Sequence, residues 1–270
     1  MTTKQISSPI EYWNDGKTRI IFPEDENGRK IEIGYFFGVQ FTGYSTHYPL
    51  PLLYSHHNEK LILPTKEMFM SLGRATLYDE LMHYEGDIKN TDLMYNGDVY
   101  YFVYNMANYY HFIYDTLPYL YGYFNEKQYF PNLKLLVSPP EGKTDLYPFV
   151  WDTLALLGIT RNDVVFLNDK ARYKMVLVGS SLTHDGLSNT PPHEKVFDII
   201  NRLQGEYDGP EKVYISRRTW LHNKTDNIGT NMTEARKCVN EDEVAEYFIS
   251  LGFEEVFCEN LSMKEKIGLF

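Results

Sequence analysis

The sequence predicts an α/β protein with two units, and three features of the 270-residue chain lead to that prediction. Short apolar strands alternate with helices from about residue 97 to residue 203, a pattern typical of βαβ units in a mainly parallel sheet. A Ser-, Asn- and Pro-containing segment at 187–193 resembles a linker. A second strand–helix–strand series begins at Lys212. We therefore expect one domain at 1–205 and another at 206–270, with the boundary inside 187–211.

The first 65 residues are expected to form strands and irregular loops. The runs at 19–23 and 30–37 are apolar or alternating over strand length, and the polar stretch between them predicts a hairpin. His47, His56 and His57 lie close together in a loop-like region. Their spacing matches no regular set of metal ligands, so no metal is expected there.

Periodicity and capping residues set the expected bounds of the later elements. Gly158 and Gly252 each follow an amphipathic run and are expected to close a helix. The pattern predicts strands at 97–104, 133–138, 164–167, 173–179, 212–218 and 253–257, and helices at 66–81, 147–157, 194–203, 244–251 and from 262 onward.

The charge balance excludes several classes of partner. The chain has 26 basic and 37 acidic residues and a net charge of −11. A surface for nucleic acid or anionic membrane needs a basic excess, so neither is an expected partner.

No run approaches the roughly 18 apolar residues of a membrane span, and Cys238 and Cys258 are too isolated for a disulfide framework or a zinc site. The expected location is the cytoplasm.

The best-placed pair of chemically active side chains lies in an aromatic-rich run at 100–124. Asn108 is a suitable N-cap, so a helix is expected from Tyr109, with His111 and Asp115 four residues apart on one face. The carboxylate can hold one imidazole nitrogen protonated and leave the other as a base near neutral pH. The alternative is a hydrogen-bonded histidine in an aromatic core and a solvated Asp115 ahead of a kink at Pro118. Tyrosines in a cleft can also stack on sugars, although they fill ordinary cores more often.

Two adjacent arginines, Arg217 and Arg218, follow the strand expected at 212–218. Each planar guanidinium can make two parallel bonds to phosphate oxygens, so the pair is suited to a diphosphate. Neighbouring arginines also occur as an ordinary solvated charge pair.

Four ordered segments, at 108–118, 213–218, 236–241 and 252–267, resemble the signature of family 61 glycosyltransferases. The resemblance implies a GT-B architecture of two Rossmann-like domains, a nucleotide-sugar donor, inversion at the anomeric carbon, and no metal or other cofactor. It implies a cleft role for His111. It also assigns donor-side positions to Arg217, Arg218, Arg236, Asn240 and Glu241.

The chain departs from the family pattern after the helix that begins at Ser262. In the family this helix leads to another strand and a Gly-rich segment with a histidine, whereas the sequence here ends at Phe270. The resemblance therefore predicts an incomplete, truncated second Rossmann-type domain. A second polypeptide could complete it, or the chain could be a catalytically inactive carbohydrate-binding or scaffold protein.

The leading hypothesis is a glycosyltransferase that moves a sugar from a nucleotide sugar to a hydroxyl of a glycan or glycoprotein. His111, oriented by Asp115, would take the acceptor proton, while Arg217 and Arg218 would stabilise the leaving diphosphate. The inactive binding protein is the competing class. A metal hydrolase is disfavoured because the scattered histidines have no consistent ligand spacing.

Overall fold

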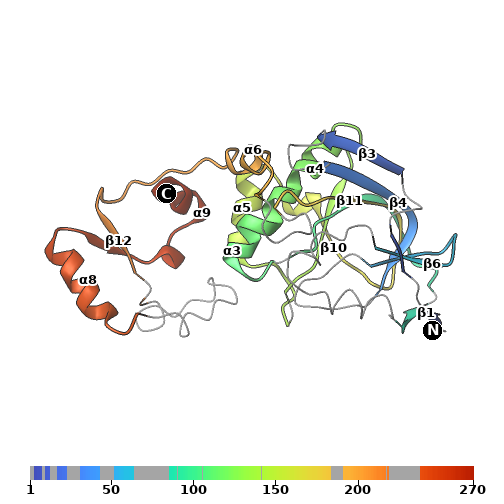
Figure 1. Ribbon diagram of the computed structural model, residues 1–270, viewed down its shortest axis with the longest axis horizontal. Helices are drawn as coiled ribbons and strands as arrows, with labels where there is room; N and C mark the ends of the chain where they lie inside the picture. The colour runs from blue at the N-terminus through green and yellow to red at the C-terminus, as the bar shows by residue number, and fades with distance from the viewer. Residues whose placement is uncertain are drawn as a thin grey trace.

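The computed structural model describes residues 3–7, 10–12, 17–22, 31–42, 52–63, 85–89, 91–104, 106–140, 142–183, 191–216, 218 and 238–270. Most of these residues belong to one unit built on a large sheet, and the C-terminal elements form a smaller unit beside it (Figure 1). The helix expected at 66–81 and the loop containing His47 lie outside the described residues.

Within the ranges that the structure describes, the large sheet has nine strands and is mixed. Its parallel half contains, in spatial order, β10 (Val164–Phe166), β9 (Lys134–Val137), β8 (Met94–Tyr101) and β11 (Arg172–Gly179). The antiparallel half continues from β11 through β4 (Ile31–Phe41), β5 (Leu53–Ser55) and β6 (Lys60–Leu63), with β3 (Lys17–Phe22) also paired to β4. The expected α/β class is confirmed. The expected parallel pairing of β8, β9, β10 and β11 is confirmed, but the sheet as a whole is not mainly parallel, because β3, β4, β5 and β6 join it through antiparallel pairs.

The long strand β4 explains how the two halves join. Ile31, Ile33, Phe36 and Val39 are buried, and the strand pairs with β11 on one side and with β3 and β5 on the other. The pairing of β3 with β4 confirms the predicted hairpin. Two short strands complete the N-terminal region: β2 (Ile10–Tyr12) runs parallel to β6, whereas β1 (Thr3–Ser7) pairs with β7 (Glu85–Lys89) in a separate two-stranded sheet.

Helical elements follow β8 and β9 along the chain. After β8 come α3 (Tyr109–His111), the π-helical turn η1 (Phe112–Thr116), the 3₁₀ turn η2 (Leu117–Tyr119) and α4 (Leu120–Glu126). After β9 comes α5 (Pro148–Leu156), followed by the 3₁₀ turn η3 (Arg161–Asp163). The short α6 (Val196–Ile200) packs on η2 and α4 and occupies only the middle of the helix predicted at 194–203. These helices stand between the sheet and the C-terminal unit (Figure 1).

A fully buried carboxylate joins α4 to the N-terminal strands. Glu126 accepts a hydrogen bond from the Tyr35 hydroxyl at 2.5 Å and a salt-bridging bond from Arg19. Buried charges need such partners, since an isolated carboxylate in this position would be costly. The hydrogen bond to Glu126 and burial both contribute to raising the pKa of Tyr35, with burial the larger cause.

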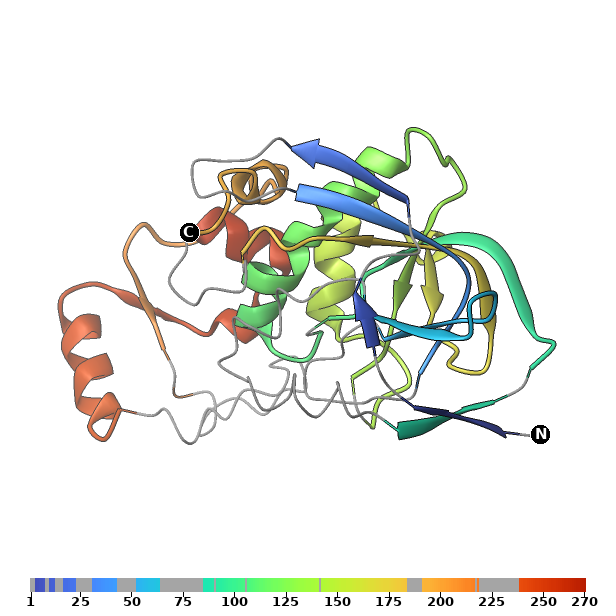
Figure 2. The ribbon, with the colours of Figure 1, turned by 45° about the vertical axis from the view of Figure 1, so that its right-hand side comes forward.

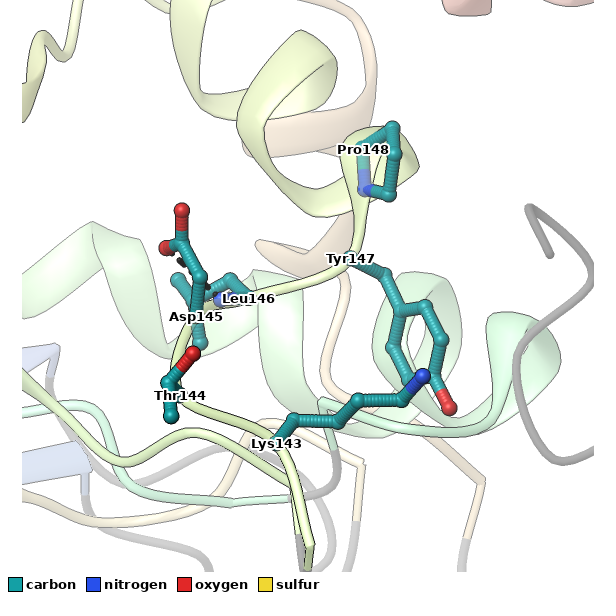
Figure 3. A pocket seen from close by; sticks show the side chains of 6 residues that line it. All are labelled: Lys143, Thr144, Asp145, Leu146, Tyr147 and Pro148. Atoms are coloured by element: carbon teal, nitrogen blue, oxygen red, sulfur yellow. Dashed lines mark hydrogen bonds between the residues drawn. The ribbon is translucent and has the colours of Figure 1, made fainter.

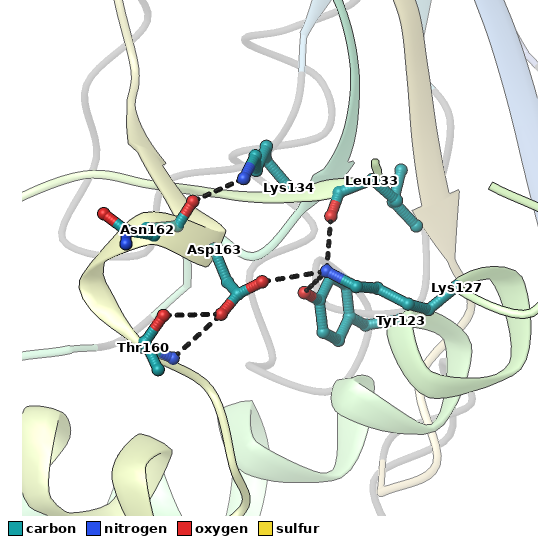
Figure 4. Close-up of polar contacts among 7 residues, drawn as sticks. All are labelled: Tyr123, Lys127, Leu133, Lys134, Thr160, Asn162 and Asp163. Atoms are coloured by element: carbon teal, nitrogen blue, oxygen red, sulfur yellow. Dashed lines mark hydrogen bonds and ion pairs between the residues drawn. The ribbon is translucent and has the colours of Figure 1, made fainter. Parts of the chain in front are cut away.

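A second polar network fixes the connection between α4, β9 and η3 (Figure 4). Lys127 donates to Asp163 at 2.9 Å, to the Tyr123 hydroxyl at 2.8 Å and to the Leu133 carbonyl at 3.0 Å. Asp163 also accepts from the backbone and hydroxyl of Thr160. Burial alone would raise the pKa of Asp163, but the bonds from Lys127 and Thr160 outweigh it and lower this pKa to about 2.

This network should weaken in acid. The folded-state pKa of Asp163 lies below the unfolded value of about 3.9, so its stabilisation is present above about pH 4 and is lost as the pH falls toward 2. We expect Asp163→Asn to lower the free energy of unfolding by about 1 kcal/mol at pH 6 and by roughly half as much at pH 3. Urea unfolding at the two pH values measures this, with the exposed Asp208→Asn as control. An equal loss at both pH values would contradict the prediction.

The C-terminal unit contains a β–α–β arrangement. The parallel strands β12 (Val213–Ile215) and β13 (Glu254–Val256) are separated in sequence by α8 (Glu241–Ser250), which packs against both. The ring of Phe248 stacks on Tyr214 at 5.3 Å and meets the edge of Phe253 at 5.3 Å. Helix α8 begins three residues before the predicted start at 244, and its acidic first turn complements the positive end of the helix dipole.

The last helix joins the two units. After the 3₁₀ turn η5 (Cys258–Asn260), α9 (Met263–Leu269) begins with a capping box between Ser262 and Glu265, as the Ser-x-x-Glu pattern favours. Met263 is buried in the core of the large unit, and α9 packs against α5. Figure 2 shows α9 beside the helices that follow β8 and β9. None of the helices in the described ranges has the length and apolar character needed to cross a membrane.

Candidate functional site

The parallel half of the large sheet has a point where the strand order reverses. Along the chain β8 is followed by β9 and β10 on one side, whereas β11 lies on the other side of β8. In open parallel sheets of this order, ligands bind beyond the carboxyl ends of the strands at such a reversal. The chain that leaves the carboxyl end of β8 leads directly to α3 and His111. The topology therefore places the predicted His/Asp pair at the position where a ligand site is expected.

The shape of the helical segment that carries His111 depends on a capping residue at its start and on a proline near its end. The side chain of Asn108 accepts a hydrogen bond from the backbone N–H of His111 at 3.3 Å, which confirms the predicted N-cap. One turn later the helix widens, and Leu117 donates to the carbonyl of Phe112, five residues earlier. Pro118 has no N–H to donate to the carbonyl of Tyr114, and its ring crowds that carbonyl, so a regular α-helix cannot continue through this point. Single π-helical turns of this kind occur frequently at functional sites.

The widened turn holds the two candidate catalytic side chains together. Nδ1 of His111 lies 2.5 Å from Oδ2 of Asp115. A carboxylate only accepts hydrogen bonds, so we assign the proton to Nδ1, which leaves Nε2 as the unprotonated ring nitrogen. The Asp115 side chain is only 12% exposed, whereas that of His111 is 29% exposed. The imidazole is thus oriented by a largely buried partner and remains accessible to a substrate.

The chain that follows the neighbouring strand β9 forms a small hollow. It has a volume of about 190 Å³ and is lined by residues 143–148, at the start of α5 (Figure 3). The ammonium group of Lys143 lies 5.5 Å from the centre of the Tyr147 ring. Asp145 is already engaged, since it accepts bonds from the Leu146 N–H, Trp151 and Arg161. The volume of the hollow is below the roughly 300–1,000 Å³ of pockets that bind drug-sized ligands.

The rings of three aromatic residues connect this hollow to the His111 segment. Tyr147 stacks on Phe149 at 5.7 Å, and Phe149 meets the edge of Tyr109 at 5.4 Å. The start of α5, which lines the hollow, is therefore in contact with the segment that carries His111.

Three of the predicted donor-side residues lie together in the C-terminal unit. Arg218 follows β12, while Asn240 and Glu241 stand at the start of α8. The Arg218 guanidinium makes two bonds to Glu255, at 2.9 and 2.5 Å, and one to Asp242 at 2.7 Å. These hydrogen bonds raise the pKa of Arg218 above its already high ordinary value.

This pairing bears on the predicted phosphate contact. Two carboxylates already occupy the planar fork of Arg218, so a phosphate would have to compete with Glu255 for it. Arg217 and Arg236 lie outside the described residues. The donor-binding role of all five positions stays a prediction.

Two features near His111 were not predicted from the sequence. The first is Lys266 of α9, which is 6% exposed and whose ammonium lies 5.5 Å from the centre of the Tyr109 ring. Burial lowers the pKa of this lysine. The second is the exposed ring of Tyr110, which stacks on Tyr114. The Lys-Glu-Lys run of α9 resembles a solvated face, and only the docking of α9 reveals the buried position of Lys266.

A cluster of three or more metal-ligating side chains would mark a metal site. In the ranges that the structure describes, which include His56 and His57 but not His47, no such group has an arrangement that could hold a metal ion.

Comparison with known proteins identifies the family. The chain has no significant match among curated proteins or among solved structures. The family model described as Glycosyltransferase 61 matches residues 109–270, which is more than half of the chain and includes His111, Asp115 and the whole C-terminal unit. The match supports glycosyltransferase activity and confirms the resemblance carried by the ordered motifs. The chain therefore belongs to glycosyltransferase family 61.

Proposed function

We propose that this protein is an inverting, metal-independent glycosyltransferase with a GT-B arrangement, in which the large unit binds the acceptor and the C-terminal unit binds a nucleotide-sugar donor. The observation that carries the proposal is the His111–Asp115 pair, joined at 2.5 Å beside the reversal in strand order. The order β10–β9–β8–β11 matches that of a Rossmann-type half, and the β12–α8–β13 arrangement is consistent with the start of another.

The proposed reaction is a single displacement. The acceptor oxygen attacks the anomeric carbon of the donor sugar, while Nε2 of His111 takes the proton of that hydroxyl. The bond between the anomeric carbon and the diphosphate oxygen breaks, and the nucleoside diphosphate leaves with the electron pair. Asp115 keeps the imidazole in the tautomer that can accept a proton and stabilises the imidazolium that forms.

Cationic side chains are proposed to balance the charge of the leaving group. Arg217, Arg218 and Arg236 are the family-matched candidates, and Asn240 and Glu241 are proposed to contact the donor from the start of α8. Fixed cations stabilise a developing negative charge most strongly where water is excluded. The lack of a requirement for a metal ion or other cofactor is proposed from the resemblance to family 61, with these cations neutralising the leaving group.

A binding screen followed by a transfer assay tests the function. Nucleoside diphosphates and nucleotide sugars are first screened by thermal shift, because a ligand that binds only the folded form raises the melting temperature. Each donor that binds is then incubated with glycan and peptide acceptors, and the products are detected by mass spectrometry. We expect one nucleotide class to raise the melting temperature and its sugar to appear on a hydroxyl with inverted anomeric configuration.

The outcomes separate transferase from binding protein. Transfer with retained configuration would contradict the proposed displacement. Binding of glycans without binding or turnover of any nucleotide sugar would instead support the catalytically inactive carbohydrate-binding protein.

A further inference from the structure

The residue before His111 is a large aromatic side chain that stays outside the core. Tyr110 is 61% exposed, although Phe112 and most of the segment that follows are buried. Its ring centre lies 5.3 Å from that of the His111 imidazole, with the two planes at 73°. An exposed ring in direct contact with the candidate base is placed where a substrate must approach.

The position of this ring is fixed by a second tyrosine. Tyr110 and Tyr114 stack with ring centres 5.7 Å apart and planes at 16°. Tyr114 belongs to the π-helical turn that also carries Asp115, so the geometry that orients His111 also orients Tyr110. Tyrosine has only two main side-chain torsions, and a ring held in this way offers contact area at little further entropic cost.

We infer that Tyr110, supported by Tyr114, is a stacking platform for a pyranose ring of the acceptor. An aromatic face provides a flat apolar surface, and a pyranose presents a similar surface through its axial C–H groups. A sugar that lies on the exposed part of the Tyr110 ring would bring its hydroxyl groups toward the adjacent imidazole, which is the geometry that proton transfer needs.

This inference rests on the proposed function and specifies its acceptor. The acceptor would be a glycan rather than a serine or threonine of a protein. A peptide hydroxyl has no ring to stack, so it would gain nothing from the platform. The roles of the two residues differ: His111 reacts with the acceptor, whereas Tyr110 binds it.

Substitution of the platform should act on acceptor binding. We expect Tyr110→Ala to raise the KM for a glycan acceptor about three- to tenfold, with kcat within about twofold and the donor KM unchanged. Tyr110→Phe and Tyr110→Trp should keep a KM close to that of the native protein, because they retain the ring. Tyr247→Ala is the matched control, since Tyr247 is a 62% exposed helical tyrosine on α8.

Glycoside binding measured without donor tests the platform separately from the transferase activity. Methyl β-xylopyranoside, methyl β-glucopyranoside and xylotetraose are titrated without donor, and binding is followed by saturation-transfer NMR. Saturable binding that is weakened in Tyr110→Ala and retained in Tyr110→Phe supports the platform, even if no donor is ever turned over. All variants are checked by thermal unfolding, and little change is expected because the ring is exposed.

Four results would overturn the inference. Three of them are unchanged acceptor KM and glycoside binding in Tyr110→Ala, an equal loss in Tyr247→Ala, and a lack of saturable binding of all three glycosides to the native protein. Transfer to a peptide hydroxyl at a KM unaffected by Tyr110→Ala would likewise reject the glycan platform while leaving the transferase activity intact.

Discussion

Replacing His111 by alanine is expected to lower kcat by at least about 100-fold while donor binding stays nearly unchanged. A positioned general base contributes about 10²–10⁴-fold in rate, and this contribution exists only in the transition state. The imidazole is partly exposed and its ring contributes little to the core, so the variant should fold. Turnover measured at saturating donor and acceptor, together with the donor dissociation constant, tests the prediction.

Asp115→Asn should give an intermediate rate. The imidazole survives, but an amide cannot stabilise the imidazolium as a carboxylate does, and it no longer requires the proton to stay on Nδ1. His57→Ala is a suitable control, since His57 is an exposed histidine in the turn between β5 and β6. Near-normal turnover in a folded His111→Ala protein would remove this residue from the mechanism.

Local chemistry made much of the fold predictable. Asn108 and Ser262 cap the helices they were expected to begin, because their side-chain oxygens accept amides of the first turn. Gly158 and Gly252 have φ of +76° and +83° just after α5 and α8, the left-handed conformation that ends a helix most readily at glycine. The strands β9, β10 and β11 were also visible as short apolar runs.

The mixed character of the sheet was not predictable in the same way. The pairing of β4 with β11 joins segments about 140 residues apart, such as Ile33 with Gly179, and no local pattern specifies the direction in which they meet. Both strands are rich in apolar residues, which suits a buried central strand in either orientation. The strands of both segments could therefore be predicted from the sequence, but not the pairing that joins the N-terminal strands to the parallel strands in one sheet.

In the candidate site, too, local contacts could be predicted and contacts between separate elements could not. The four-residue spacing of His111 and Asp115 predicted their contact, because side chains at this spacing are neighbours on one helical face. The ion pairs of Arg218 with Glu255 and Asp242 bring together three separate elements, and adjacent arginines alone gave no sign of them. The exposure of Tyr110 likewise depends on which face of its segment the core covers.

A methyl group at Gly205 is expected to separate the two units. A Cβ at this position would lie 2.1 Å from the backbone nitrogen of Gly268 and 2.5 Å from the carbonyl carbon of Ile267, so α9 would have to move. Its displacement would expose Met263 and break the contact of Lys266 with Tyr109. Overpacking of this kind costs about 1–3 kcal/mol or more. We expect Gly205→Ala to lower the melting temperature and to make the C-terminal unit sensitive to limited proteolysis.

The choice of control makes this prediction specific to docking. Gly209→Ala changes the same connecting segment, but the three atoms nearest to its Cβ would all belong to the side chain of Tyr207, which can move aside. Because α9 also contacts the segment that carries His111, Gly205→Ala should reduce both stability and turnover, whereas His111→Ala should reduce turnover alone. A Gly205→Ala protein as stable and protease-resistant as the Gly209→Ala protein would show that α9 does not hold the two units together, and the proposed alignment of donor and acceptor sides would then need another support.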